Sequence, residues 1–140
     1  MCAIIDLFDR SIVAYRISDR QNKSLVKNTI KIALAKLDKN SATPIILHSD
    51  QGYLFATQEH KHLLDTSNVI PSMSNPGSPH DSAVIESFFS CLKSKCIHLL
   101  PKIRAKEMIA EADRYVVFYY HYKIHMKFPL LCTLLSVLIR

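Results

Sequence analysis

Two acidic residues and one lysine have the types and spacing that metal-dependent chemistry on phosphate requires. Asp50 follows a short apolar run, and Glu86 lies in a segment of helical character with Lys93 two helical turns further on. Carboxylate oxygens are the ligands that hard divalent cations prefer in proteins, and a nearby lysine can hold a phosphate. We therefore expect a site that holds divalent metal against nucleic-acid phosphate.

Asp50 is expected just beyond the end of a buried strand. The apolar residues 44–48 predict that strand, and Ser49-Asp50-Gln51-Gly52 follows it. Open α/β sheets bind their ligands beyond the carboxyl ends of their strands, which favours a functional role for Asp50. The alternative is an aspartate that only forms the turn before Gly52. The local sequence leaves both interpretations open.

Glu86 is expected on the open side of a helix that starts near Asp81 or Ser82. At 100° per residue, Glu86 and Lys93 fall within about 20° of each other and well over 100° from the centre of the apolar face. That face comprises Val84, Ile85, Phe88, Phe89, Leu92 and Cys96. An ordinary solvated glutamate and lysine would show the same geometry, so the helix pattern alone does not select a metal ligand.

The remaining segments predict alternating strands and helices. Apolar runs predict strands at 3–8, 11–17 and 69–73, the last at a sheet edge because Pro71 donates no ladder hydrogen bond. Helical spacing predicts helices from Asn22 or Ser24 to about residue 39, at 55–67 and at 104–125. Tyrosines and basic residues over 119–127 could contact nucleic acid, or the tyrosines could pack that helix on the core.

Composition bounds the class of protein. The 140 residues suffice for one domain with a real core, and 49% hydrophobic against 21% charged residues indicates a globular chain. The net charge of +6 favours an anionic partner, most commonly nucleic acid, although a basic surface without a partner is the alternative.

The cysteines indicate the redox environment of the protein, and the apolar C-terminal run bears on whether the chain spans a membrane. Cys2, Cys91, Cys96 and Cys132 show no metal-binding spacing, so we expect unpaired thiols of a reducing cytosol. The ten residues 130–139 are mostly apolar, whereas a membrane-spanning helix needs about 20. We expect this tail to be a packing segment or an aberrant end, and no membrane contact.

Three sequence motifs together resemble a known family. They are His48-Ser49-Asp50-Gln51-Gly52, the stretch Ser72-Met73-Ser74-Asn75-Pro76-Gly77-Ser78-Pro79-His80-Asp81-Ser82-Ala83-Val84-Ile85-Glu86-Ser87-Phe88-Phe89, and Leu92-Lys93-Ser94. With 35 residues between Asp50 and Glu86, this pattern resembles the integrase core of bacterial transposases of the insertion sequence 3 family, relatives of retroviral integrases. The resemblance extends to about Pro129.

The resemblance implies a fold and a chemistry. The fold is α/β and RNase H-like, a mixed five-stranded sheet flanked by helices. In such a site three carboxylates hold two Mg²⁺ or Mn²⁺ ions for DNA strand cleavage and transfer. By resemblance Asp50 and Glu86 are catalytic metal ligands and Lys93 binds DNA. His48, Gly52 and Asp81 are structural residues near the site, with Asp81 capping the helix.

The chain departs from this family at both ends. The family's first catalytic aspartate lies on a first strand, and this chain starts in what resembles the second. Asp6 matches a structural position of the family rather than the catalytic one. We therefore expect a missing first strand and an open sheet edge prone to self-association. After Phe128 the family's usual ending is replaced, so we expect a partial core at 1–129 and an aberrant apolar tail at 130–140.

These observations lead to a functional expectation. We expect a truncated transposase core that binds metal weakly and does not transpose DNA. Its partners would be transposon ends and target DNA, with possible homo-oligomers or mixed assembly with an intact transposase, in a bacterial cytoplasm at the nucleoid. One alternative is a non-catalytic nucleic-acid-binding remnant. Another is an RNase H-type nuclease, for which Asp6 is the only candidate further acid.

Overall fold

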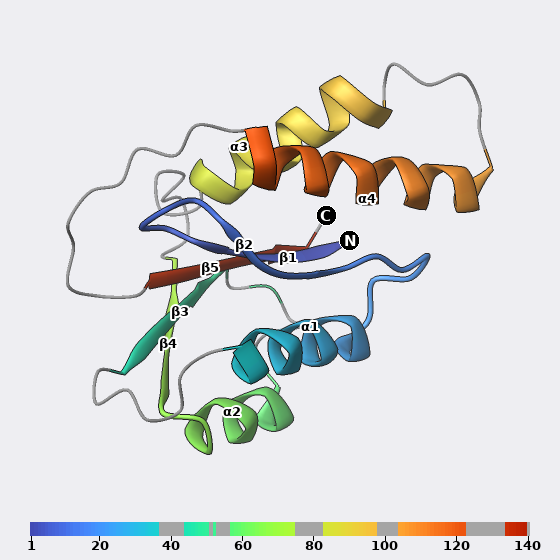
Figure 1. Cartoon of the computed structure of the whole chain (residues 1–140). Coiled ribbons are helices and arrows are strands. Elements are labelled where there is room, and N and C mark those ends of the chain that lie inside the picture. Colours follow the sequence, from blue (N-terminus) through green and yellow to red (C-terminus); the bar gives the residue numbers. More distant parts are fainter. Residues whose placement is uncertain are drawn as a thin grey trace.

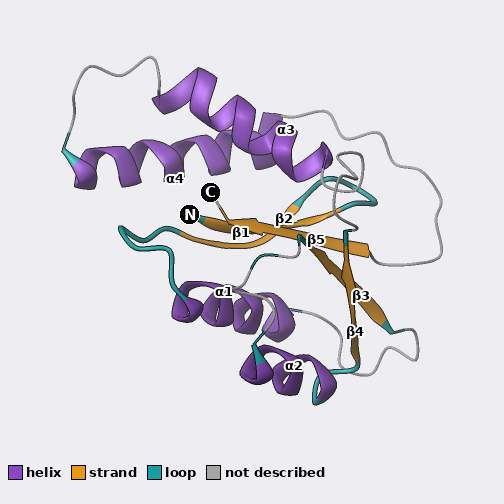
Figure 2. Ribbon diagram, turned by 180° about the vertical axis from the view of Figure 1, so that it is seen from behind, coloured by secondary structure: helices purple, strands orange, loops and turns teal. Residues whose placement is uncertain are grey.

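Five strands form one sheet, and two helices cover each of its faces (Figure 1; Figure 2). The computed structural model describes residues 1–36, 44–50, 52, 57–74, 83–97, 104–122 and 134–139. The strands are β1 (Cys2–Asp6), β2 (Ile12–Arg16), β3 (Ile45–Ser49), β4 (Val69–Met73) and β5 (Leu134–Ile139). The helices are α1 (Lys23–Lys36), α2 (Gln58–Asp65), α3 (Ala83–Leu92), its π-helical continuation η1 (Lys93–Ile97), and α4 (Ala105–Tyr122).

The sheet is mixed, as the sequence predicted. Its order is β2-β1-β5-β3-β4, with β1 antiparallel to both β2 and β5 and with β3 parallel to both β5 and β4. Strand β4 lies at one edge, which confirms the prediction made from Pro71. Asn22 caps α1, since its side-chain Oδ1 accepts a hydrogen bond of 2.9 Å from the Leu25 N–H.

The open edge expected beside the first strand is not present in the described sheet. Residues 134–139, which lie in the run expected to be a packing segment or an aberrant end, form β5 in the middle of the sheet (Figure 1). β5 pairs with β1 on one side and with β3 on the other. The physical reason is that an apolar strand and two bare strand edges each carry unpaired backbone groups, and their pairing satisfies all of them.

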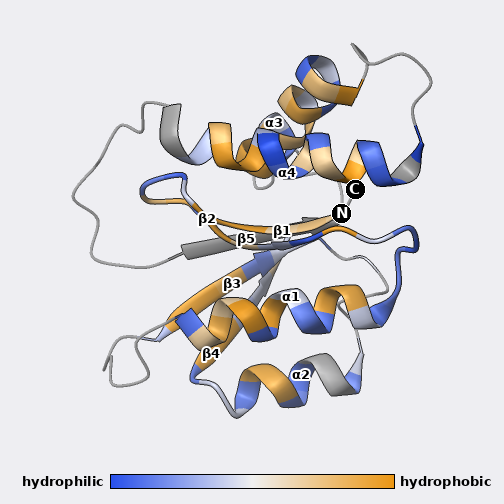
Figure 3. Cartoon of the chain, turned by 45° about the vertical axis from the view of Figure 1, so that its right-hand side comes forward, coloured by the Kyte–Doolittle hydropathy of each residue, from blue (hydrophilic) through white to orange (hydrophobic). Residues whose placement is uncertain are grey.

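Strand alternation divides the core into two layers. Cys2 and Ile4 of β1 belong to a cluster with residues of α1 and α2, whereas Ala3 and Ile5 belong to a cluster with residues of α3 and α4. Successive side chains of a strand point to opposite faces of a sheet, so each face of β1 is buried by its own helix pair. Figure 3 shows the resulting hydrophobic character of β1 and β2 and the hydrophilic connection between β2 and α1.

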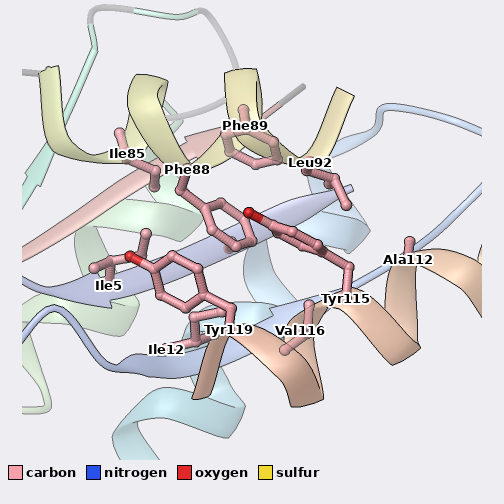
Figure 4. Close-up of a cluster of buried hydrophobic side chains, with 11 residues drawn as sticks. Ile5, Ile12, Ile85, Phe88, Phe89, Leu92, Ala112, Tyr115, Val116 and Tyr119 are labelled. Atoms are coloured by element: carbon pink, nitrogen blue, oxygen red, sulfur yellow. The ribbon is translucent and has the colours of Figure 1, made fainter. Parts of the chain in front are cut away.

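Aromatic side chains join α3 and α4 over β1 and β2. Phe88 is fully buried, and its ring centroid lies 5.3 Å from that of Phe89, 6.0 Å from Tyr115 and 5.0 Å from Tyr119. Figure 4 shows these rings between the two helices and the strands. The apolar face predicted for this helix is confirmed, and Tyr115 and Tyr119 pack on the core. Burial raises the pKa of the Tyr115 hydroxyl above its usual range.

The described cysteines are free thiols, as expected. Cys2 is buried, and Cys91 and Cys96 are half-buried. Burial raises the pKa of the Cys2 thiol to about 11, although a hydrogen bond with Thr29 acts in the opposite direction. Cys132 lies outside the described residues. Cys2 therefore behaves as a small apolar core residue and stays protonated near neutral pH.

Phe88→Ala is expected to destabilise the fold by about 3–5 kcal/mol, because truncation leaves a cavity between α3, α4 and the sheet. Chemical denaturation followed by circular dichroism measures this change. Val117→Ala on the same helix pair is the control, because Val117 is 55% exposed and its truncation should cost less than about 0.5 kcal/mol. Equal losses for the two variants would contradict the core assignment.

Candidate metal site

Asp50 lies one residue beyond β3, as the sequence predicted. It is half-buried, and the backbone N–H of Gly52 donates a 3.0 Å hydrogen bond to its Oδ1. This bond is the turn interaction that was the alternative interpretation of Asp50. A carboxylate has about four lone-pair positions, so a single backbone donor leaves most of its acceptor capacity for another role. The turn fixes Asp50 without excluding it as a ligand.

His48 anchors the end of β3 to β4. Its Nδ1 lies 3.0 Å from Oγ of Ser72 and its Nε2 lies 2.8 Å from Oγ of Ser74. The backbone N–H of Ser74 also donates to the carbonyl of Ser49 at 3.0 Å. Both ring nitrogens are therefore engaged by hydroxyls, which supports a structural role for His48 beside Asp50. The residues 72–74 belong to a recognised motif, but their role as partners of His48 was not foreseen.

Alternation along β3 places Asp50 on the side of the sheet that α3 and α4 cover. Leu47 packs in the cluster of α1 and α2, so His48 faces the opposite layer. Continued past Ser49, the alternation brings Asp50 to that same layer. Glu86 is exposed on α3, and α3 contacts β5, the strand next to β3. The two carboxylates thus belong to one side of the sheet.

Lys93 begins the π-helical turn that continues α3, and it is exposed like Glu86. The change from α- to π-helical winding falls at Lys93, after the last α-helical residue Leu92. The winding is therefore α-helical from Glu86 to Leu92, the residue before Lys93. Asp81 lies outside the described residues, as does the predicted start of this helix before Ala83.

The strand residues paired with the end of β3 carry no acid. Ser49, the last residue of β3, pairs with Met73 of β4 and with Val137 of β5. In the part of the chain that the structure describes, no three His, Cys, Asp or Glu residues form a group that could hold a metal ion. The described residues therefore do not fit a three-carboxylate, two-metal centre.

Asp6 does not supply the missing acid. In register it is level with Leu135 of β5, which is level with Leu47 of β3. Three residues of strand rise and two strand spacings then separate the Cα atoms of Asp6 and Asp50 by about 14 Å. Alternation along β1 also turns Asp6 to the opposite face. Carboxylates on one cation must bring their oxygens within about 5 Å of each other.

Asp6 has a structural role in the β1–β2 connection. Its Oδ1 accepts a 2.8 Å hydrogen bond from the Phe8 N–H, and its own N–H donates to the Ser11 carbonyl at 2.9 Å. Burial raises the pKa of the Asp6 carboxyl, the Phe8 bond opposes that shift, and the charge of Asp9 adds to it. This agrees with the expectation that Asp6 occupies a structural position.

Comparison with known proteins identifies relatives. The sequence model of the family described as "Integrase core domain" matches residues 1–79. The chain is 32% identical over 124 residues to transposase InsK of insertion sequence element IS150 from Escherichia coli, covering 89% of this chain and 43% of the relative. It is 31% identical over 119 residues to the transposase of IS904 from Lactococcus lactis, covering 85% and 46%.

A third relative and one solved structure extend the comparison. Transposase InsF of IS3A from Escherichia coli is 31% identical over 98 residues, covering 70% of this chain and 33% of the relative. The chain thus spans less than half the length of these three relatives. A structure of a simian T-cell lymphotropic virus intasome with PP2A regulatory subunit B56 gamma contains a chain with TM-score 0.66 and 19% identity, covering 94% and 44%.

These comparisons agree with the fold and with the motifs around Asp50. The intasome chain shares the fold, so the mixed sheet flanked by helices is RNase H-like as the sequence resemblance implied. None of the described helices is both long enough and apolar enough to cross a bilayer. The family model covers β1 to β4 and Asp50. The chain therefore belongs to the integrase core domain family and is an integrase core of the insertion sequence 3 transposase type.

Proposed function

We propose that this chain is a transposase core that binds DNA and a single divalent ion weakly, and that it does not itself cleave or join DNA strands. The observation that carries the proposal is the environment of Asp50. It follows β3 on the α3 side, as an integrase-core ligand would, but the residues paired with Ser49 at the end of β3 are Met73 and Val137, neither of which is acidic. Family membership supports the DNA-directed role, and the lack of a group of three acids among the residues that the structure describes supports the loss of catalysis.

Asp50 and Glu86 are the proposed ligands, with Mg²⁺ or Mn²⁺ as the ion. Both acids belong to one side of the sheet, and carboxylate oxygens suit these hard cations. When bound, a divalent ion polarises a phosphate oxygen, and a two-ion site stabilises both the attacking and the leaving oxygen. Two protein carboxylates supply less charge and fewer ligands than the three of the family. We therefore propose weak binding of one ion and assign no reaction step to it.

DNA is the proposed macromolecular partner, with Lys93 as a phosphate contact. The net charge of +6 attracts a polyanion, and Lys93 is exposed at the end of the helix that carries Glu86. By relation to the transposases, the DNA would be transposon ends and target, in a bacterial cytoplasm at the nucleoid. Assembly with further copies or with an intact transposase is part of the same proposal.

The metal assignment is tested by Mn²⁺ titration of the full chain, followed by electron paramagnetic resonance. The wild type is expected to bind one ion weakly, and Asp50→Ala and Glu86→Ala should each reduce the affinity by about tenfold or more, because each removes a charged ligand. Asp65→Ala is the control, since Asp65 is exposed at the end of α2 on the other side of the sheet. Unchanged binding in both site variants would refute the assignment.

The loss of catalysis is tested in nicking and strand-transfer assays with Mn²⁺ and labelled DNA duplexes. No product above the protein-free reaction is expected, because the site has two of the three carboxylates that hold the ion pair. Product formation that Asp50→Ala abolishes would overturn this part of the proposal.

The non-catalytic DNA-binding role is tested with Lys93→Ala. Removal of one phosphate contact should lower the slope of log K against log salt by about 0.9, and binding should weaken on every duplex sequence. Lys106→Ala is the matched control, because Lys106 is also exposed but lies in the first turn of α4. The same change in both variants would show a general charge effect and would count against a contact at Lys93.

The nuclease alternative predicts that Asp6 is essential, whereas its position predicts the opposite. Asp6→Asn should leave DNA handling unchanged and stabilise the fold at pH 7, because burial raises the pKa of Asp6 and disfavours its charged form. The gain should vanish below pH of about 3.9, where folded and unfolded wild type are both protonated, and grow as pH rises through the folded-state pKa. Denaturation across this pH range measures it. Loss of a nuclease activity in Asp6→Asn would favour the alternative.

A further inference from the structure

We infer that the outer side of α1 is a second binding surface for the phosphate backbone of duplex DNA, separate from the contact proposed at Lys93. α1 packs on the face of the sheet opposite to α3 and α4 (Figure 1). We name this surface the α1 ridge and define it by Lys23, Lys27 and Lys31. It needs neither a metal ion nor a ligand role for Asp50.

The positive charge of the chain is concentrated in the segment that contains α1. Residues 16–36 contain six basic residues and one acidic residue, so they carry a net charge of +5 out of the chain's +6. The 12 basic residues left of 18 and the 11 acidic residues left of 12 almost cancel. α1 itself contains four lysines and no carboxylate. A polyanion is therefore attracted to the α1 side of the molecule more strongly than to the side that carries Lys93.

Packing turns the lysines of the α1 ridge to solvent. The buried residues of α1 are Leu25, Val26, Thr29, Ile30 and Ala33. Lys23, Lys27 and Lys31 are exposed and recur every four residues, so they follow one row along the helix with a rise of about 6 Å per step. The row spans about 12 Å, a length over which duplex DNA carries about seven phosphate charges. Several phosphates can therefore lie within reach of the three ammonium groups.

Both ends of α1 are fastened. Lys36 is outside the α1 ridge, because its Nζ donates a 2.7 Å hydrogen bond to the backbone carbonyl of Val13 in β2. At the other end, Asn22 caps the first turn through the N–H of Leu25. The row of lysines thus starts from a helix that is already fixed on the sheet, which lowers the cost of ordering on binding.

The chemistry of the exposed side of α1 favours a phosphate backbone over a membrane or a protein. Ser24 and Asn28 are exposed beside the lysines, and such side chains donate hydrogen bonds to phosphate oxygens. Among the described residues, none of the large exposed hydrophobic side chains belongs to α1. A helix that binds a membrane surface needs an exposed apolar face, and a protein interface has an apolar centre. The choice of DNA as the phosphate ligand rests on the proposed function.

The test removes the charge of the α1 ridge in the full chain. The triple variant Lys23→Gln, Lys27→Gln and Lys31→Gln should lower the slope of log K against log salt by about 2.7, because each phosphate contact contributes about 0.9. Glutamine has nearly the helix propensity of lysine, so the circular dichroism of the variant should match the wild type. If the triple variant does not fold, Lys27→Gln and Lys31→Gln replace it, and each should lower the slope by about 0.9.

The matched control removes the same charge from the other side of the sheet. Arg104→Gln, Lys106→Gln and Arg114→Gln change three exposed residues in and just before α4. This second triple variant should lower the slope by less than about 0.9. Equal decreases in the two triple variants would show a general charge effect and would overturn the α1 ridge as a binding surface.

Lysine acetylation of the wild type gives a readout that does not depend on the folding of a variant. Saturating duplex DNA should protect Lys23, Lys27 and Lys31 from an N-hydroxysuccinimide ester, whereas Lys106 should stay reactive. Mass spectrometry of the digested protein measures the modification at each position. Undiminished acetylation of the α1 ridge in the DNA complex would contradict the inference.

The two DNA contacts can fail separately. A slope that falls in the ridge variant but not in Lys93→Ala keeps the α1 ridge and refutes the contact at Lys93. The reverse result refutes the α1 ridge and leaves the proposed function in place. Vesicles of phosphatidylcholine and phosphatidylserine are the last probe. If the ridge variant loses vesicle binding while its DNA binding is unchanged, the α1 ridge is a lipid surface and the inference is overturned.

Discussion

The pairing of β5 with both β1 and β3 is the interaction on which the rest of the structure depends. β1 and β3 do not pair with each other, and they lie on opposite sides of this one strand. Without β5 each would leave a row of backbone N–H and C=O groups unpaired inside the molecule, where every such group costs free energy comparable to a lost hydrogen bond. The strand therefore holds together the two halves of the sheet and fixes the level of Asp50.

The helices use this sheet in different ways on its two faces. α1 and α2 bury an aliphatic layer, whereas α3 and α4 meet through the rings around Phe88. Because Ile85, Phe88 and Phe89 are buried on one side of α3, Glu86 is turned outward on the same helix. Packing thus determines the side of α3 on which Glu86 lies. His48 lies on the face of β3 that α3 and α4 cover.

The site retains the framework of an integrase core but lacks a complete ligand set in the described residues. The turn at Gly52 and the serine partners of His48 keep the end of β3 in a defined place. Apart from Asp50 itself, none of these hydrogen bonds involves an acidic side chain. The position of the end of β3 is therefore set by these neutral and backbone partners of His48 and Asp50.

The sequence by itself determined the types of the elements from β1 to α4, the mixed α/β class, the edge position of β4 through Pro71, the buried face of α3 and the place of Asp50 after a strand. Each of these follows from local periodicity or from the chemistry of one residue, and the motifs around Asp50 and Glu86 identified the lineage. Only the tertiary structure decided that residues 134–139 are the central strand and that Ser72 and Ser74 hold His48. The reason is that a ten-residue apolar run has no period that selects its partners. Strand register is set by pairing between distant segments, which local sequence does not encode.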